Sequence, residues 1–218
     1  MNKYVTEFIG TLFLVLTIGL SVLQGVVPAP LAIGAALMVM VYMGGHISGA
    51  HYNPAVSLAI FMRGKLSGPE LIPYWIAQIA GATTAALLVW IILGRTFAPA
   101  PGGGASVYQA LVVEMLYTFA LALVVLNVAT APATAGNSYY GLAIGFTIVA
   151  AAFAGGGISG GAYNPAVGIG PTIVNATLGE GSWSHLWLYL VGPFAGAAFA
   201  AGVFRFQMGG SENSSAEG

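Results

Sequence analysis

The feature that decides the fold is the stretch GHISGAHYNPAV at residues 45–56, because a close copy, GGISGGAYNPAV, recurs at residues 156–167. The two copies are 111 residues apart, and the tetrapeptide LAIG recurs at the same spacing, at residues 31–34 and 142–145. Chance does not account for a repeat of this length and spacing. The chain therefore consists of two related halves.

The composition around this repeat is that of a membrane protein. Charged residues make up 5% of the chain, against about 25% in an ordinary soluble domain. So few charges cannot cover a water-exposed surface, which excludes a soluble enzyme, and an apolar content of 58% excludes a disordered chain. A net charge of −1 without a basic run leaves no footprint for nucleic acid, and the absence of cysteine excludes disulfides and thiolate sites.

The apolar residues are grouped into segments long enough to cross a bilayer, which takes about 20 residues in a helix. The sequence predicts six such helices, at residues 4–23, 31–45, 70–93, 106–129, 139–156 and 183–206, of which the second and fifth are short. Each half holds three spans, an odd number, so the second half is inverted in the membrane relative to the first.

This pattern predicts one all-α transmembrane domain over residues 1–206. Its parts are a first repeat at about 3–93, a loop at 94–105, a second repeat at about 106–206, and a disordered tail at 207–218. Six spans place both termini on one side. Lys3, Arg63, Lys65 and Arg205 fall on that side, and Arg95 on the other. By the positive-inside rule the termini and the tail are cytoplasmic, and the protein belongs in a cell membrane, plasma or inner.

The repeated motif itself predicts a loop that leads into a short helix. Asn53 and Asn164 suit the N-cap, and the prolines that follow suit the first helical position. The apolar runs at 55–62 and 166–174 are too short to span, so we expect two re-entrant half-helices, whose N-termini meet near the membrane midplane.

Two half-helix N-termini facing each other create a site with a defined electrostatic character. Each carries about +0.5 of an elementary charge from its aligned peptide dipoles. If the asparagine oxygens cap the helices, the amide N–H groups point outward and donate to a passing water. That water turns its hydrogens toward the exits and prevents proton hopping. Free carbonyls at 45–52 and 155–163 would form the acceptor rail along which a solute moves.

With these motifs, residues 3–206 resemble the aquaporin (major intrinsic protein) family. The resemblance implies six tilted helices with two half-helices, and a pore in each subunit of a homotetramer. No cluster of residues has metal-ligand spacing, and no cofactor is expected. The resemblance also implies a role for both Asn-Pro-Ala motifs in the pore, with the two asparagines as paired donors. The motif residues are Asn53, Pro54, Ala55, Asn164, Pro165 and Ala166.

Three further residues are candidates for support of these loops. Glu7 and Glu114 recur in the two halves, and carboxylates inside spanning helices have a function by default. They either couple transport to protons or, as the resemblance favours, accept hydrogen bonds from the loops behind each half-helix. His46 is expected to hold the first loop in place and to line the cytoplasmic vestibule.

The selectivity filter departs from the family pattern. Val167 stands where water-selective members carry arginine. By their distances from the two asparagines, the other filter positions are Ile33, Ala152 and Gly161. Such a ring is apolar and wide, unless bulk from Phe146 or Phe153 fills it.

The sequence therefore predicts a passive channel in the lipid bilayer for water and small uncharged solutes such as glycerol, urea and neutral metalloid hydroxides. Three alternatives remain: a water-selective channel whose filter is filled by other residues, an ion-coupled secondary transporter, and a structural membrane protein with a closed pore. An enzyme is not expected.

Overall fold

The structure is a computed structural model that describes residues 1–212, and every regular element in this range is helical. The elements are α1 (Asn2–Leu23), α2 (Ala29–Ser48), α3 (Pro54–Met62), α4 (Gly68–Leu93), α5 (Val107–Thr130), the 3₁₀ turn η1 (Pro132–Thr134), α6 (Tyr140–Ser159), α7 (Pro165–Leu178) and α8 (Leu188–Glu212). Six of these helices are long and apolar enough to cross a membrane, whereas α3 and α7 are too short. The predicted fold class is confirmed.

Three of the six spanning helices differ from their predicted bounds by three residues or more. Helices α2 and α6 are full spans of 20 residues, because both continue helically through the glycines as far as Ser48 and Ser159. Helix α8 begins at Leu188, and residues 183–187 precede it as turns. Its other end is Glu212, so residues 207–212 are helical and not part of a disordered tail. The remainder of the expected tail lies outside the described residues.

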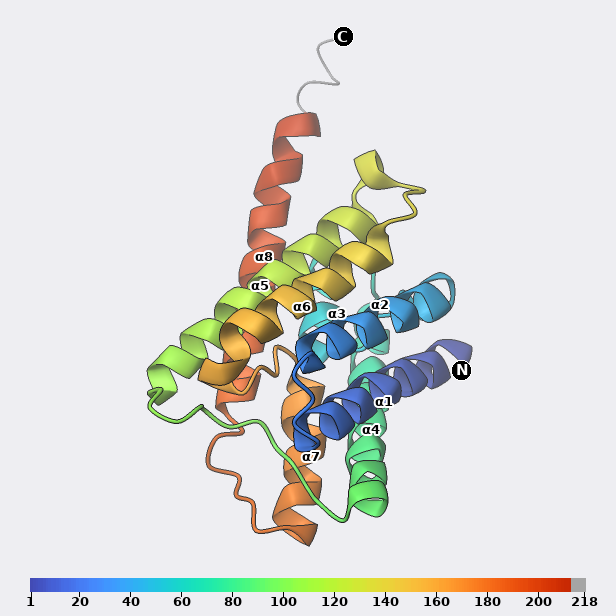
Figure 1. Ribbon diagram of the computed structural model, residues 1–218. Helices are drawn as coiled ribbons and strands as arrows, with labels where there is room; N and C mark the ends of the chain where they lie inside the picture. The colour runs from blue at the N-terminus through green and yellow to red at the C-terminus, as the bar shows by residue number, and fades with distance from the viewer. Residues whose placement is uncertain (213–218) are drawn as a thin grey trace.

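The helices pack as two copies of one unit around a pseudo-two-fold axis. Helix α1 packs against α2 and α4, and α5 packs in the same way against α6 and α8. On the axis α2 meets α6, and the half-helices α3 and α7 begin near the middle of the bundle (Figure 1).

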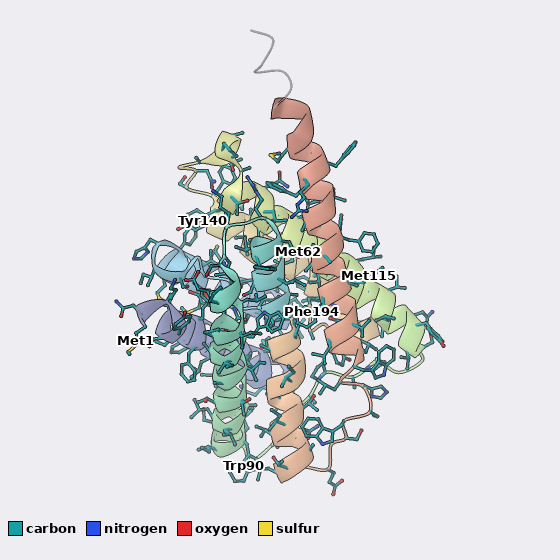
Figure 2. The ribbon with its side chains drawn as sticks, turned by 180° about the vertical axis from the view of Figure 1, so that it is seen from behind. Met1, Met62, Trp90, Met115, Tyr140 and Phe194 are labelled. Carbon is teal, nitrogen blue, oxygen red and sulfur yellow. The ribbon has the colours of Figure 1, made fainter. Side chains whose placement is uncertain are left out.

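The half-helices are exchanged between the two repeats. Helix α3 packs mainly against α8 of the second repeat, and α7 packs mainly against α4 of the first. Seen from behind, Met62 at the end of α3 is drawn beside α8 (Figure 2), and the Arg205 guanidinium of α8 donates to the carbonyl oxygen of Met62. Neither repeat therefore completes its own packing.

Glycine sets the closest helix crossings. A methyl group on Gly34 of α2 would lie 2.6 Å from the carbonyl oxygen of Gly145 of α6, and one on Gly145 would lie 2.5 Å from that of Gly34. Backbones in a membrane approach this closely only where no side chain separates them. The α2–α6 crossing at the axis is thus a backbone contact.

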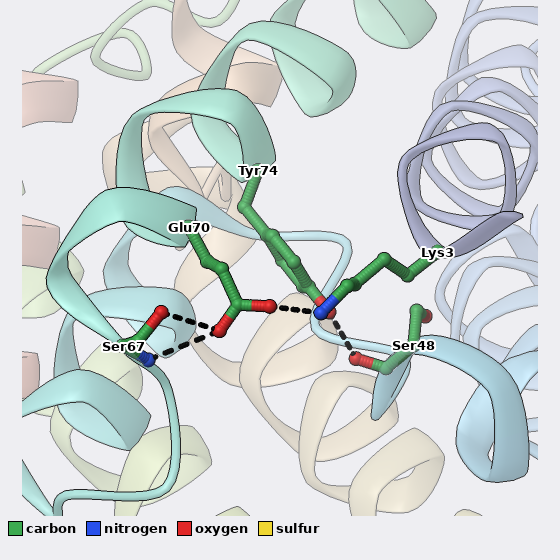
Figure 3. A network of polar contacts seen from close by, with 5 residues as sticks. All are labelled: Lys3, Ser48, Ser67, Glu70 and Tyr74. Carbon is green, nitrogen blue, oxygen red and sulfur yellow. Dashed lines mark hydrogen bonds and ion pairs between the residues drawn. The ribbon is translucent and has the colours of Figure 1, made fainter. Parts of the chain in front are cut away.

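Polar contacts fix the helix ends on the side of the termini (Figure 3). Lys3 of α1 forms an ion pair with Glu70, which also accepts from the Ser67 hydroxyl in the capping box of α4. The Tyr74 hydroxyl donates to the carbonyl oxygen of Ser48, 2.6 Å away, at the last residue of α2. These contacts join α1, α2 and α4 around the loop that leads into α3.

Candidate functional site: two facing half-helix loops

Each half-helix starts at an asparagine cap, as predicted. Asn53 Oδ1 accepts from the backbone N–H groups of Ala55 at 2.9 Å and Val56 at 3.4 Å, and Asn164 Oδ1 accepts from that of Ala166 at 2.9 Å. The prolines occupy the first helical position. Pro54, Ala55, Pro165 and Ala166 are buried in the first turns and do not line the cavity described below.

The two caps are also bonded to each other's loops. Asn53 Nδ2 donates to the carbonyl oxygen of Tyr163, and Asn164 Nδ2 donates to that of Tyr52, both at 2.9 Å. An amide nitrogen carries two hydrogens. The sequence predicts that these hydrogens point toward a passing water, whereas the structure leaves one N–H on each asparagine without a partner among the described residues.

The loops have an unusual backbone that recurs in both repeats. Gly49 and Gly160 end α2 and α6 with φ values of 85° and 88°. Tyr52 and Tyr163 also have positive φ, 49° and 51°, which costs a residue with a side chain about 1–3 kcal/mol. Such a conformation persists only where its surroundings hold it.

Glu7 and Glu114 supply that support. Glu7 accepts from the backbone N–H of His51 at 2.9 Å and that of Tyr52 at 2.7 Å, and Glu114 accepts from those of Ala162 at 2.9 Å and Tyr163 at 2.6 Å. A serine hydroxyl at the end of the preceding helix, from Ser48 or Ser159, also donates to each carboxylate. Both carboxylates are fully buried and neither lines the cavity, which favours support of the loops over coupling to protons.

One polar network breaks the symmetry. Gln78 Nε2 donates to Glu7 Oε2 at 2.8 Å and to Ser57 Oγ at 2.9 Å, and Ser57 Oγ lies 3.0 Å from His51 Nδ1. The Tyr74 and Tyr189 hydroxyls donate to the equivalent carbonyls of Ser48 and Ser159, so Gln78, four residues after Tyr74, corresponds to Pro193. The 111-residue offset relates Ser57 to Gly168 and His51 to Ala162. Glu7 therefore accepts one bond more than Glu114.

A narrow cavity runs between the two loops. It has a volume of about 40 Å³ for the centres of water molecules, and one water needs about 10–15 Å³ on this measure. The cavity brings together both asparagines and all four expected filter residues, Ile33, Ala152, Gly161 and Val167. Phe146 and Phe153 are 51% and 60% exposed and do not line it, so they do not fill the ring.

On the side of the molecule that carries both termini, the cavity adjoins a larger vestibule with a volume of about 830 Å³. His46 is exposed and lines this vestibule, and within residues 1–212 its side chain forms no hydrogen bond. Hydrogen bonds to the first loop come from Glu7 and Tyr74.

The free carbonyls are fewer than predicted. The helix ends occupy the carbonyls of Gly45 and Gly156, tyrosine hydroxyls occupy those of Ser48 and Ser159, and the asparagines occupy those of Tyr52 and Tyr163. Within residues 1–212, the carbonyls of 49–51 and 160–162 receive no hydrogen bond, so each loop offers at least these three acceptors.

Comparisons with known proteins agree with this geometry. The sequence profile described as "Major intrinsic protein" matches residues 1–204. Aquaporin NIP1-4 of Oryza sativa subsp. japonica is 39% identical over 215 residues, which cover 94% of this chain and 76% of the relative. Glycerol uptake facilitator protein-like 6 of Lactiplantibacillus plantarum is 37% identical over 226 residues, 98% of this chain and all of the relative. The X-ray structure of the aquaglyceroporin from Plasmodium falciparum has a TM-score of 0.84 at 22% identity and covers 93% of this chain and 94% of that one.

Proposed function

The chain belongs to the major intrinsic protein family and is a membrane channel for water and glycerol-type small solutes, not an enzyme, and from this premise we propose which residues conduct and select. The conduction path is the cavity between Asn53 and Asn164. Its outer filter is formed by Ile33, Ala152, Gly161 and Val167.

The observation that carries this proposal is the pairing of the two caps at the centre of the cavity. Each asparagine keeps one N–H free, and each stands at the positive end of a half-helix. A central water that accepts from both N–H groups cannot also accept a proton, so the hydrogen-bonded file is interrupted. The free loop carbonyls on either side, among them those of 49–51 and 160–162, receive the hydrogens of the next molecules.

The outer filter selects for uncharged solutes by size and not by hydrogen bonding. Valine at position 167 is 3% exposed and offers neither the donors nor the positive charge of an arginine. A ring of isoleucine, alanine, glycine and valine leaves room for the apolar C–H groups of a small polyol. The cargo we propose is water, glycerol, urea and neutral metalloid hydroxides, and the similarity to the glycerol uptake facilitator protein-like 6 supports the polyol.

Val167→Arg should reduce glycerol and urea permeability far more than water permeability, because a guanidinium beside Gly161 fills space that valine leaves open. The selectivity change is expected to be at least about tenfold, since filling a pocket by a few heavy atoms discriminates on that scale. Adding Ile33→Phe should increase it. Stopped-flow volume changes of proteoliposomes, at matched protein density and with a panel of solutes, measure each permeability.

The control for this experiment is Phe146→Ala, which changes a large exposed side chain outside the cavity and should leave every permeability unchanged. An equal proportional loss of water and solute flux in Val167→Arg would place the outer constriction elsewhere. Saturating flux with a high activation energy in the parent protein would contradict a passive channel.

We also propose that the termini are cytoplasmic, that the host is a plasma or inner membrane, and that four subunits assemble with four separate pores. The distribution of basic residues supports the orientation, and family membership supports the tetramer. Mass measurement in mild detergent should give four subunits per particle. A monomer that remains fully active after reconstitution would contradict a need for the assembly.

A further inference from the structure

The inner end of the cavity is the place where it adjoins the vestibule. The cavity of about 40 Å³ and the vestibule of about 830 Å³ share three lining residues, His51, Val125 and Ile144. These three residues mark the boundary between the two volumes, and we call them the inner ring.

The internal repeat indicates that this end is tighter than the outer one. The 111-residue offset of the repeat pairs each outer filter position with an inner one. The pairs, outer residue first, are Ile33 with Ile144, Ala152 with Val41, Gly161 with Ala50, and Val167 with Val56. Each inner residue is as large as its outer counterpart or larger. All four inner residues line the cavity or the vestibule and are less than 9% exposed.

The polar network around His51 fixes the orientation of its ring hydrogen. A carboxylate only accepts, so the Gln78 amide must direct Nε2 toward Glu7, and its second hydrogen goes to Ser57 Oγ. We assign the Ser57 hydroxyl, which already accepts from Gln78, as the donor to His51 Nδ1, and this assignment places the proton of the neutral imidazole on Nε2.

The His51 ring borders the path, because His51 lines both the cavity and the vestibule. A methyl group on Gly49 would lie 3.1 Å from Nε2, so the absence of a side chain at this glycine leaves room beside the ring nitrogen. The second repeat has Ala162 in place of the histidine, so the donor belongs to the inner end alone.

We propose that His51, Val125 and Ile144 form an inner selectivity filter that sets the upper size of the solutes and orients their hydroxyl groups. The carbon edge of a polyol lies against Val125 and Ile144 while one of its oxygens accepts from His51 Nε2–H. This inference rests on the proposed conduction path and adds to it the residues that limit size.

The test compares two identical substitutions at positions related by the repeat. Ile144→Ala should raise the permeability to a four-carbon polyol, erythritol, by about tenfold, because a change of one or two carbon groups in a pocket alters its discrimination between solutes on this scale. Ile33→Ala, the same change at the repeat-related position in the outer filter, should raise it less, because the outer ring is already wide. Ile144→Phe should lower glycerol permeability more than water permeability. This variant tests the same position if the alanine variant does not fold.

The donor is tested by His51→Gln, which retains an N–H, against His51→Leu, which does not. The ratio of glycerol to water permeability should be lower in the leucine variant.

A larger effect of Ile33→Ala than of Ile144→Ala would overturn the inner filter, as would unchanged fluxes in all Ile144 variants while Val167→Arg still alters selectivity. If Val167→Arg and the Ile144 variants all leave every flux unchanged, the conduction path itself is wrong, and the inner filter fails with it.

Discussion

Glu114→Gln is expected to abolish most of the channel flux and to destabilise the protein more than Glu7→Gln. In the parent protein, Ser159 and Ala162 donate to Oε1 of Glu114, and Tyr163 donates to Oε2. The glutamine has a single oxygen, which can replace one of these acceptors but not both. One buried backbone N–H is then left without an acceptor, at a cost of about 1–3 kcal/mol. The left-handed backbone of Tyr163 loses its support, and the capping loop of Asn164 moves with it.

Glu7→Gln is the matched comparison. It also leaves one backbone N–H, that of His51 or Tyr52, without an acceptor, but the first repeat has an acceptor for the hydrogens of the new amide. Gln78 Oε1 is buried and has no partner among the described residues. A rotation of the Gln78 amide therefore lets this oxygen accept from a glutamine at position 7, and Ser57 and His51 can reverse their own hydrogen bond. Pro193 offers no such rescue in the second repeat.

Thermal unfolding in detergent and flux per protein measure this difference. Equal loss in the two variants would contradict the asymmetry, and a Glu114→Gln protein with parental flux and unfolding temperature would show that the carboxylate does not support the loop.

Gly145→Ala is expected to prevent the native assembly of α2 and α6. The added methyl group would meet the Gly34 carbonyl oxygen at 2.5 Å, and a backbone atom cannot rotate out of the way as a flexible side chain can. The helices must separate, which displaces Ile33 and Ile144, their neighbours in sequence, from the cavity wall. Little monodisperse protein and almost no selective flux should remain.

Gly156→Ala in the same helix is the control, because a methyl group there meets no other atom within 4 Å. Alanine favours a helix over glycine by about 1 kcal/mol. The control should therefore be at least as stable as the parent, and size-exclusion chromatography with flux measurement distinguishes the two variants. Normal protein from Gly145→Ala would contradict a backbone contact at the axis.

The sequence was sufficient for the features that follow from a repeat and from membrane thickness. Six spans, two half-helices and the asparagine caps each depend on local composition or on the inversion of one half. The ends of α2 and α6 were placed too early because glycine breaks helices in water, whereas in a membrane the backbone must keep its internal hydrogen bonds.

The contacts that sequence reasoning missed are those between distant segments. The bonds from each asparagine to the opposite tyrosine carbonyl join the two repeats, and nothing near Asn53 in the chain indicates them. Tyr52 and Tyr163 did carry a signal, since they recur at the repeat spacing. Gln78 carried none, because its counterpart is a proline.

The packing of each half-helix against the other repeat also determines when, during synthesis, the fold can be completed. Helix α3 leaves the ribosome long before α8, the helix against which it packs, has been translated. The first three spans can enter the bilayer in order, but α3 has to wait beside an unfilled position until the last span arrives. A chain truncated before Leu188 would leave α3 without its neighbour, so the pore can be completed only after translation has reached the end of the final helix.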